Sequence, residues 1–349
     1  MRTIKICTIK KGGFEMSKRQ IGKVVCVLFV ALALLPIAQS SAPGAETTKQ
    51  RQEFLIGGGS AGGFAAVLAE GCAEAIRRSF PNWSVTSTIG EVASNIKLVH
   101  DGDLQLTIAY PELITEANKG TGTYKNPMPD VKMVAHFTLW PNQFVLLGKV
   151  AINTVEEWKQ KKLPLRINVQ KRGSGTNVLN ERLLNAYGIT IDDIKSWGGT
   201  VRFEGGTRSM MLIKDGLLDG SLFTGACPLA ALIELGSTRN LKIVSHDPKI
   251  IKQLVNEYGY IKKVVPKGTY KWLTTDISTV AVGAGIAAST KLEPGVVRDI
   301  TRAFVEQIKY LRALHKALKP LSVEQLADIP VDIIHPEARQ HYESLGIKF

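Results

Sequence analysis

Residues 54–80 read FLIGGGSAGGFAAVLAEGCAEAIRRSF, and this stretch decides the fold class of the chain. Its apolar start leads into glycines at positions 57, 59 and 62, which fit the spacing G-x-G-x-x-G. Apolar residues then recur at helical spacing. We expect a strand over Glu53–Gly57, a loop over 58–63 and a helix over Phe64–Ser79, followed by a strand that starts at Trp83. This order of elements predicts an α/β fold.

The glycine loop predicts a site for an anion. Glycines allow positive φ angles and a close approach of the backbone, and the start of a helix offers free N–H groups. A nicotinamide cofactor is disfavoured, because the acidic residue that could hold its ribose, Glu91, lies beyond the usual spacing of about twenty residues. An exported protein also meets no maintained pool of this cofactor. We therefore predict a small anion as the ligand and no cofactor.

The first 45 residues carry the features of an export signal. The basic segment MSKRQIGK opens at Met16 and precedes an apolar stretch at 24–38 and the small, turn-forming residues QSSAPGAETT. We predict a signal peptide over 1–45, with 1–15 as an upstream extension and cleavage after Ala45 or near Ser40, and hence a periplasmic protein. The apolar stretch is short for a membrane span, and an uncleaved anchor is the alternative.

Composition argues against nucleic acid and against a metal site. The net charge is +13, but the first 45 residues hold 7 of the 44 Lys and Arg and 1 of the 31 Asp and Glu, which leaves +7 for the rest. The remaining basic residues are scattered, so we predict no nucleic-acid partner. Cys72 and Cys227 follow the signal, and we expect small buried side chains there. The six His lie apart, and no metal ligand set is predicted.

Three later segments repeat the order of strand, polar loop and helix. In one of them, Arg166–Gln170 is the expected strand, Lys171–Thr176 the loop and Asn177–Tyr187 the helix. The other two lie at 98–113 and at 212–235. Ligands of open α/β sheets collect beyond the carboxyl ends of the strands. These loops and the first glycine loop should therefore share one site.

The loop GSGT at 173–176 offers two hydroxyl groups, and two roles are open for each of them. Ser174 and Thr176 can donate hydrogen bonds to a ligand or cap the helix that follows, and the two roles are compatible. Arg172 adds a guanidinium suited to a bidentate contact with a carboxylate.

Taken in their order along the chain, these motifs resemble those of the TAXI-type extracytoplasmic solute receptors. Such receptors deliver substrates to tripartite ATP-independent periplasmic (TRAP) transporters. The resemblance covers about Glu53 to Lys348. It rests on IGGGSAGGFAAVLAEGCAEAI, on IGEVASNIKLVHDGDLQLTIAYPE with Asn95 and Gly102, and on GSGTNVLNERLL. The segments LIKDGLLDGSLFTGACPLAALIEL, VPKGTY and HPEARQHYESLGI are similar to later parts of that family.

The resemblance implies a two-lobed type II periplasmic-binding-protein fold with the ligand cleft between the lobes. Residues 52–141 and 268–349 would form lobe 1, residues 142–267 would form lobe 2, and LWPNQFVLLGKV would be a long strand passing between them. It also implies a receptor that captures a small carboxylate, such as an amino acid or a dicarboxylate, and delivers it to the TRAP membrane subunits. We expect a monomer without enzymatic activity.

On the same basis, Tyr110 is expected to form one wall of the ligand site, and Trp140 to flank the ligand at the crossing between the lobes. A place in the core is the alternative for both. The full set of predicted ligand contacts is Gly59, Ser60, Ala61, Gly63, Phe64, Gly90, Asn95, Tyr110, Trp140, Arg172, Ser174, Gly175, Thr176, Glu204, Thr224, Gly225 and Ala226.

The chain departs from the family pattern at several of these positions. Ile89 and Val92 stand where that family usually has hydroxyls, Tyr110 stands where a polar residue is common, and Lys171 and Arg172 precede the GSGT loop. These departures suit a carboxylate that is less like an amino acid, either bulkier or with a second anionic group.

Two other functions are open. A periplasmic sensor that presents its ligand to a signalling protein would share the same fold. A secreted hydrolase is the second alternative, because Gly58, Ser60 and Gly62 fit the spacing G-x-S-x-G. A nucleophile elbow places its serine in mid-sheet, with an acid and a histidine downstream, whereas this serine follows the first strand and no histidine stands in a recognisable triad context.

Overall fold

The computed structural model describes residues 52–349, so the predicted signal peptide lies outside the described residues. Within them, ten strands form one continuous sheet in the order β2-β1-β3-β10-β4-β7-β5-β6, with β8 on β4 and β9 on β10. Helices alternate with strands along most of the chain. In this part of the chain, no helix combines the length and the apolar character that crossing a membrane requires.

Lobe 1 begins with the expected strand–helix–strand unit. Its elements are β1 (Glu53–Gly57), α1 (Phe64–Ser79), β2 (Ser84–Thr88), α2 (Val92–Asp101), β3 (Leu106–Ala109) and α3 (Pro111–Lys119). β1 lies parallel between β2 and β3. The expected bounds of β1 and α1 are confirmed, and β2 starts one residue later than expected.

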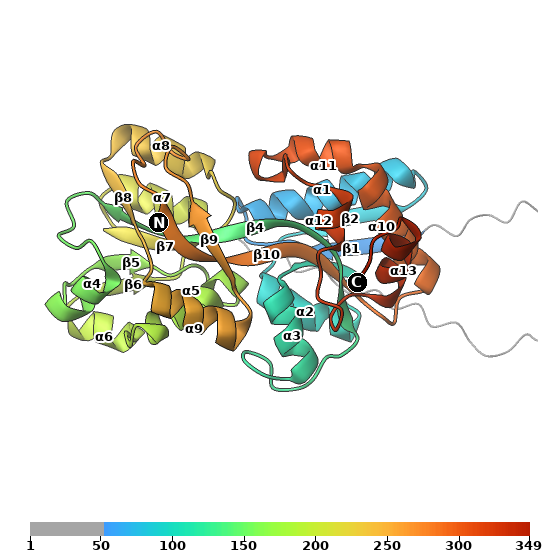
Figure 1. Ribbon diagram of the computed structural model, residues 1–349, viewed down its shortest axis with the longest axis horizontal. Coiled ribbons are helices and arrows are strands. Elements are labelled where there is room, and N and C mark those ends of the chain that lie inside the picture. Colours follow the sequence, from blue (N-terminus) through green and yellow to red (C-terminus); the bar gives the residue numbers. More distant parts are fainter. Residues whose placement is uncertain (1–51) are drawn as a thin grey trace, which may run out of the picture. The chain divides into compact units, whose positions relative to one another are not determined.

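Two long antiparallel strands connect the lobes, β4 (Val131–Leu147) and β10 (Ile277–Ser289). They run side by side between the two groups of helices (Figure 1). β10 also pairs with β3, and two register shifts interrupt its ladder with β4. Past Pro141, β4 leaves β10 and pairs with strands of lobe 2 from Asn142 onward.

Lobe 2 repeats the α/β arrangement between the two crossings. Its elements are α4 (Val155–Lys161), β5 (Arg166–Asn168), α5 (Gly175–Ala186), α6 (Ile191–Ser196), β6 (Thr200–Arg202), α7 (Gly206–Lys214), β7 (Gly220–Thr224), α8 (Ala230–Thr238), β8 (Leu241–Val244), α9 (Pro248–Tyr258) and β9 (Ile261–Val265). β5 lies parallel between β6 and β7, and β7 and β8 both pair antiparallel with the end of β4.

The C-terminal segment returns to lobe 1. Its elements are α10 (Pro294–Glu306), α11 (Ile308–Leu314), the 3-10 helix η1 (Lys316–Leu318), α12 (Val323–Ala327) and α13 (Pro336–Ser344). Helices α10 and α11 pack against α1, far away in the sequence, and α13 packs on α10 (Figure 1). Lobe 1 is therefore built from both ends of the described chain.

The segment around residue 170 differs from the sequence expectation. β5 ends at Asn168, and Gln170 has a left-handed backbone with φ of 70°, so the chain turns away from the sheet before the expected end of the strand. Helix α5 begins at Gly175, because Ser174 caps it by accepting a hydrogen bond from the Asn177 N–H at 3.1 Å. The capping role of Ser174 is confirmed.

A buried polar network holds β4 where it enters lobe 2. The Asn142 amide donates to Asn180 Oδ1 at 2.7 Å and to Thr224 Oγ1 at 2.8 Å, and its Oδ1 lies 2.9 Å from His246 Nε2. Thr279 of β10 donates to the Asn142 carbonyl at 2.7 Å. Because unpaired polar groups are costly in a buried site, this network fixes β4, α5, β7 and β10 relative to one another.

The network predicts acid-sensitive stability. Burial lowers the pKa of His246 from 6.5 to about 4, because the imidazolium would lose its hydration. The folded protein therefore binds this proton less readily than the unfolded chain, and stability falls as the pH drops from 6.5 to about 4. We expect His246→Gln to lose less unfolding free energy than the wild type between about pH 7 and about pH 4.5, as measured by urea unfolding. Equal losses in both proteins would contradict this role of His246.

Candidate ligand-binding site

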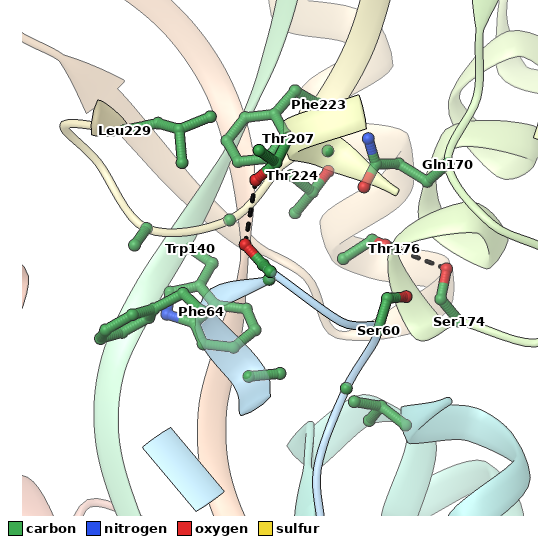
Figure 2. A pocket seen from close by; sticks show the side chains of 18 of the residues that line it. Ser60, Phe64, Trp140, Gln170, Ser174, Thr176, Thr207, Phe223, Thr224 and Leu229 are labelled. Carbon is green, nitrogen blue, oxygen red and sulfur yellow. Dashed lines mark hydrogen bonds between the residues drawn. The ribbon is translucent and has the colours of Figure 1, made fainter. Parts of the chain in front are cut away.

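Residues from both lobes enclose a small cavity of about 70 Å³ (Figure 2). Lobe 1 supplies the glycine loop, the starts of α2 and α3, and Trp140 of β4. Lobe 2 supplies the starts of α5, α7 and α8 and the end of β7. The lining residues are Gly59, Ser60, Gly62, Gly63, Phe64, Ala65, Glu91, Val92, Tyr110, Trp140, Gln170, Ser174, Thr176, Gly206, Thr207, Phe223, Thr224, Gly225, Ala226 and Leu229.

Six helices begin at this cavity, three from each lobe. The residues that precede the first turns of α1, α2, α3, α5 and α8 all line it, and so does the first residue of α7. The first N–H groups of a helix have no partner within the helix, and its N-terminus carries a partial positive charge. Several such ends around one small space favour an anion.

The charged groups near the cavity compensate one another. Glu91 is the one lining residue with an ionic side chain, and its Oε1 accepts from Ser60 Oγ at 2.8 Å and from Lys171 Nζ of lobe 2 at 2.7 Å. Glu112 is buried in the first turn of α3, and burial raises its pKa to about 8, so it is mostly protonated at neutral pH. Neither carboxyl group therefore leaves an uncompensated negative charge beside the helix starts.

The serine and threonine hydroxyls of the lining are bonded to the protein itself. Ser174 donates to the Lys171 carbonyl at 2.6 Å, and its Oγ lies 3.1 Å from Thr176 Oγ1. Thr207 donates to the Gly62 carbonyl of the opposite lobe at 2.9 Å. Figure 2 shows the Ser174–Thr176 and Thr207–Gly62 interactions as dashed lines. The hydroxyls thus hold the cavity walls in place, and Thr207 joins one lobe to the other.

Aromatic rings form the apolar side of the cavity. Trp140 lies edge-on to Tyr110 with 5.6 Å between ring centroids and is tilted against Phe64 at 5.8 Å. Phe223 covers the cavity from lobe 2 (Figure 2). Burial raises the pKa of the Tyr110 hydroxyl well above its usual value, so this group keeps its proton. The cavity therefore combines the starts of helices with an apolar wall.

The structure brings most of the predicted contacts together. Those that line the cavity are Gly59, Ser60, Gly63, Phe64, Tyr110, Trp140, Ser174, Thr176, Thr224, Gly225 and Ala226. Their place in the cavity supports their predicted role, which stays a prediction. Six other predicted contacts, namely Ala61, Gly90, Asn95, Arg172, Gly175 and Glu204, lie outside the lining.

Four of these six residues support the walls from behind. Asn95 is buried and donates to the Gly58 carbonyl at 2.8 Å, and the Gly90 N–H donates to the Gly59 carbonyl at 3.2 Å. Gly175 packs against Tyr110, and Glu204 bonds through its backbone to Asn168. The fifth, Ala61, is exposed.

The structure does not place Arg172 as a carboxylate clamp. Its side chain is exposed, and the guanidinium stacks on the Phe203 ring at 3.8 Å from the centroid. Gly173, with φ of +80°, turns the chain between Arg172 and the start of α5. The guanidinium makes a cation–π contact at the surface and does not line the cavity, and its contact with a ligand stays a prediction.

Several lining residues were absent from the sequence prediction: Gly62, Ala65, Glu91, Val92, Gln170, Gly206, Thr207, Phe223 and Leu229. The pair Gly205–Gly206 before Thr207 repeats the pattern of glycine, hydroxyl and helix start, and this signal could have revealed the start of α7. Gln170 had no such signal, since its left-handed backbone is visible only in the structure.

Other contacts join the lobes outside the cavity. Arg182 of α5 forms an ion pair with Glu116 of α3 at 2.7 Å, and both side chains are only 11% exposed. The Arg182 guanidinium also donates to the Tyr260 hydroxyl at 3.0 Å and lies over the Tyr258 ring. Gly175 faces Tyr110 so closely that an added Cβ would lie 2.6 Å from the Tyr110 ring. The lobes are thus held in contact along α3 and α5.

The residues of 52–349 do not gather three or more His, Cys, Asp or Glu in a way that could hold a metal ion. Cys72 is buried and Cys227 half-buried, and both are free thiols. Ser60, the candidate nucleophile, donates its hydroxyl to the Glu91 carboxylate rather than to a histidine. The triad of a nucleophile elbow has a histidine at this place, and none bonds Ser60 within the described residues.

Solved structures are similar to this chain at low sequence identity. The periplasmic binding protein BugD is similar at a TM-score of 0.52 and 14% identity, over 84% of this chain and 95% of that one. A TctC solute-binding protein from Polaromonas has a TM-score of 0.46 and 17% identity, over 86% and 99%. PhnD1 from Prochlorococcus marinus, in complex with methylphosphonate, has 0.49 and 13%, over 85% and 91%.

The likeness to BugD shows that the chain has the two-lobed α/β fold of periplasmic binding proteins. The sequence model of the NMT1-like family matches residues 56–346, almost the whole of the described chain, and the protein therefore belongs to the NMT1-like family.

Proposed function

We propose that this protein is an exported, non-catalytic solute receptor that captures a small organic anion between its lobes. The observation that carries the proposal is the meeting of six helix starts at one cavity enclosed by both lobes. Neutral N–H donors bind an anion without any need for a charged side chain. The aromatic wall suits the carbon skeleton of a carboxylate, such as an amino acid or a dicarboxylate.

We further propose delivery of the anion to the membrane subunits of a TRAP transporter by a monomeric receptor in the periplasm. The resemblance of the sequence motifs to TAXI-type receptors supports this partner. The solved structures of similar fold carry the descriptions periplasmic binding protein and solute-binding protein, which are in keeping with it.

The ligand would bind as the lobes close. We propose lobe boundaries near 141 and 268, and the pairing of β4 supports the first, since Pro141 pairs with β10 and Asn142 with β7. A ligand that touches both lobes stabilises the form in which they meet. Closure would change the surface at the mouth of the cleft, which membrane subunits could recognise.

A ligand screen tests the class of solute. Purified protein, freed of ligand by unfolding and refolding, should melt at a higher temperature with at least one small carboxylate, because binding stabilises the folded state by mass action. At a concentration of about 100 times Kd, the gain is about 2.7 kcal/mol. Nicotinamide and adenine nucleotides should give no shift. A shift with nucleotides and none with carboxylates would overturn the proposal.

Gly175→Ala tests closure. The new methyl group would meet Tyr110 and Leu113 of the opposite lobe, with its Cβ 2.6 Å from an atom of each. The variant should keep the lobes apart, bind the carboxylate from the screen more weakly and show a larger radius of gyration in small-angle scattering with this carboxylate. The matched control is Gly295→Ala, since a Cβ at Gly295 meets nothing within 4 Å. Unchanged affinity and radius in Gly175→Ala would contradict closure at this contact.

The Arg182–Glu116 pair should contribute to the contact between the lobes. Removing one partner leaves the other charge poorly hydrated, at a cost of about 3 kcal/mol. We expect Arg182→Met and Glu116→Gln each to lower the unfolding free energy, and the double variant to lose less than their sum, as a double-mutant cycle in urea measures. Additive losses would mean that the pair does not couple the lobes.

A further inference from the structure

A second recess, a groove, lies where the two lobes meet, and it shares no lining residue with the cavity described above. Its volume is about 410 Å³, within the range of about 300–1,000 Å³ that is common for small-molecule sites. Leu139 and Pro141 of β4 line it from lobe 1 together with η1. Cys227, Pro228 and strand β9 line it from lobe 2. The groove therefore has the size of a ligand site and a wall from each lobe.

The walls of the groove are largely apolar. Leu139, Val264 and Val265 line it together with four prolines and Ala317. Val264 is 41% exposed, so an apolar side chain of the groove is in contact with water. Covering such surface with another apolar group is favourable. The walls thus suit a ligand with an apolar body.

Two lysines give the groove its charge. Lys263 of β9 and Lys316 of η1 line it from opposite lobes, and no Asp or Glu is among its lining residues. Neither lysine belongs to an ion pair within residues 52–349. Burial raises the pKa of the Cys227 thiol in the wall to about 11, and a hydrogen bond with Tyr270 and the Lys263 charge partly oppose this rise. The groove is therefore complementary to an anion.

Both lysines lie on elements that are attached to the crossing strands. Thr138 of β4 donates its hydroxyl to the Ala317 carbonyl of η1 at 3.2 Å, next to Lys316. β9 pairs with β10, and Lys263 is the partner of Thr279 in this ladder. The backbone around each lysine is therefore fixed by hydrogen bonds, so the two charges belong to ordered walls of the groove.

We propose that this groove is a second binding site, and that it takes a small organic anion with an apolar body. Lys263 and Lys316 hold its acidic group, and its apolar part covers Leu139 and Val264. The volume favours a small molecule over a segment of a partner protein. Because the occupant touches both lobes, it stabilises the form in which they meet. The inference concerns a separate site and does not depend on the proposed function.

The first part of the test uses two fluorescent probes with the same apolar body. Anilinonaphthalene sulfonate is an apolar anion, and phenylnaphthylamine is the same molecule without the sulfonate. Both are titrated into the full protein. The sulfonate should bind more than about tenfold tighter than the neutral probe, which corresponds to about 1.4 kcal/mol. Equal affinities, or no binding of the sulfonate, would contradict a cationic site.

The second part tests the two lysines. Lys263→Met and Lys316→Met should each weaken binding of the sulfonate about tenfold and leave binding of the neutral probe unchanged. The matched controls are Lys262→Met and Lys319→Met, because these lysines are exposed neighbours that do not line the groove. The controls remove the same charge and should keep full affinity. An equal loss in the controls would mean a general attraction to basic surface and would overturn the proposal.

The third part locates the probe through Cys227. This thiol lines the groove and is half-buried, whereas Cys72 is buried. The bound sulfonate should slow alkylation of Cys227 by iodoacetamide, as mass spectrometry of the peptide that contains it measures. Unchanged alkylation at saturation would place the probe elsewhere and contradict the proposal. Protection by a tetraglutamate peptide and not by the sulfonate would also overturn it, since the groove would then suit an acidic segment of a partner protein.

Discussion

The free N–H groups at the starts of helices are the constraint on which this cavity depends. The first N–H groups of a helix have no partner further along the helix, and six helices begin at the lining of this cavity. Buried donors must find an acceptor, and like partial charges at one point repel unless an anion lies between them. An anion bound there, as proposed, would therefore stabilise the contact between the lobes.

The crossing strands determine how the two lobes can respond. β4 changes its pairing partner between Pro141 and Asn142, so one continuous backbone serves both lobes. The network around Asn142 is buried and bonded, which favours a rigid end of β4 in lobe 2. Contacts such as Thr207 with Gly62 and Arg182 with Glu116, by contrast, lie between the lobes and can break without loss of either core. We therefore expect motion at the contacts between the lobes and not at the network around Asn142.

Recognition of the proposed anion by neutral donors would have consequences for the release of the ligand. A buried guanidinium would be left uncompensated after the anion departs, at a high cost. Amide, indole and backbone N–H groups carry no net charge. Leaving them without the anion therefore costs less free energy than leaving a buried guanidinium alone. The position of Arg172, stacked on Phe203 at the surface, is consistent with this arrangement. Lys171 forms an ion pair with Glu91 of the cavity lining, which compensates its charge.

The sequence by itself determined the elements and their order. Glycine spacing and apolar periodicity gave the bounds of β1 and α1, and the GSGT loop revealed Ser174 as a helix cap, because these features depend on local backbone preferences. Eleven of the predicted contacts also line the cavity, since each lies at a helix start, at a strand end or on the crossing strand.

Only the tertiary structure decided which side chains face the cavity. Arg172 and Gln170 are two residues apart, yet Arg172 stacks on Phe203 outside while Gln170 turns inward. The pairing of Glu91 with Lys171 and of Thr207 with Gly62 joins residues of opposite lobes that lie far apart in the chain. Side-chain direction depends on backbone angles and on neighbours brought close by folding, and neither is encoded in the spacing of residue types.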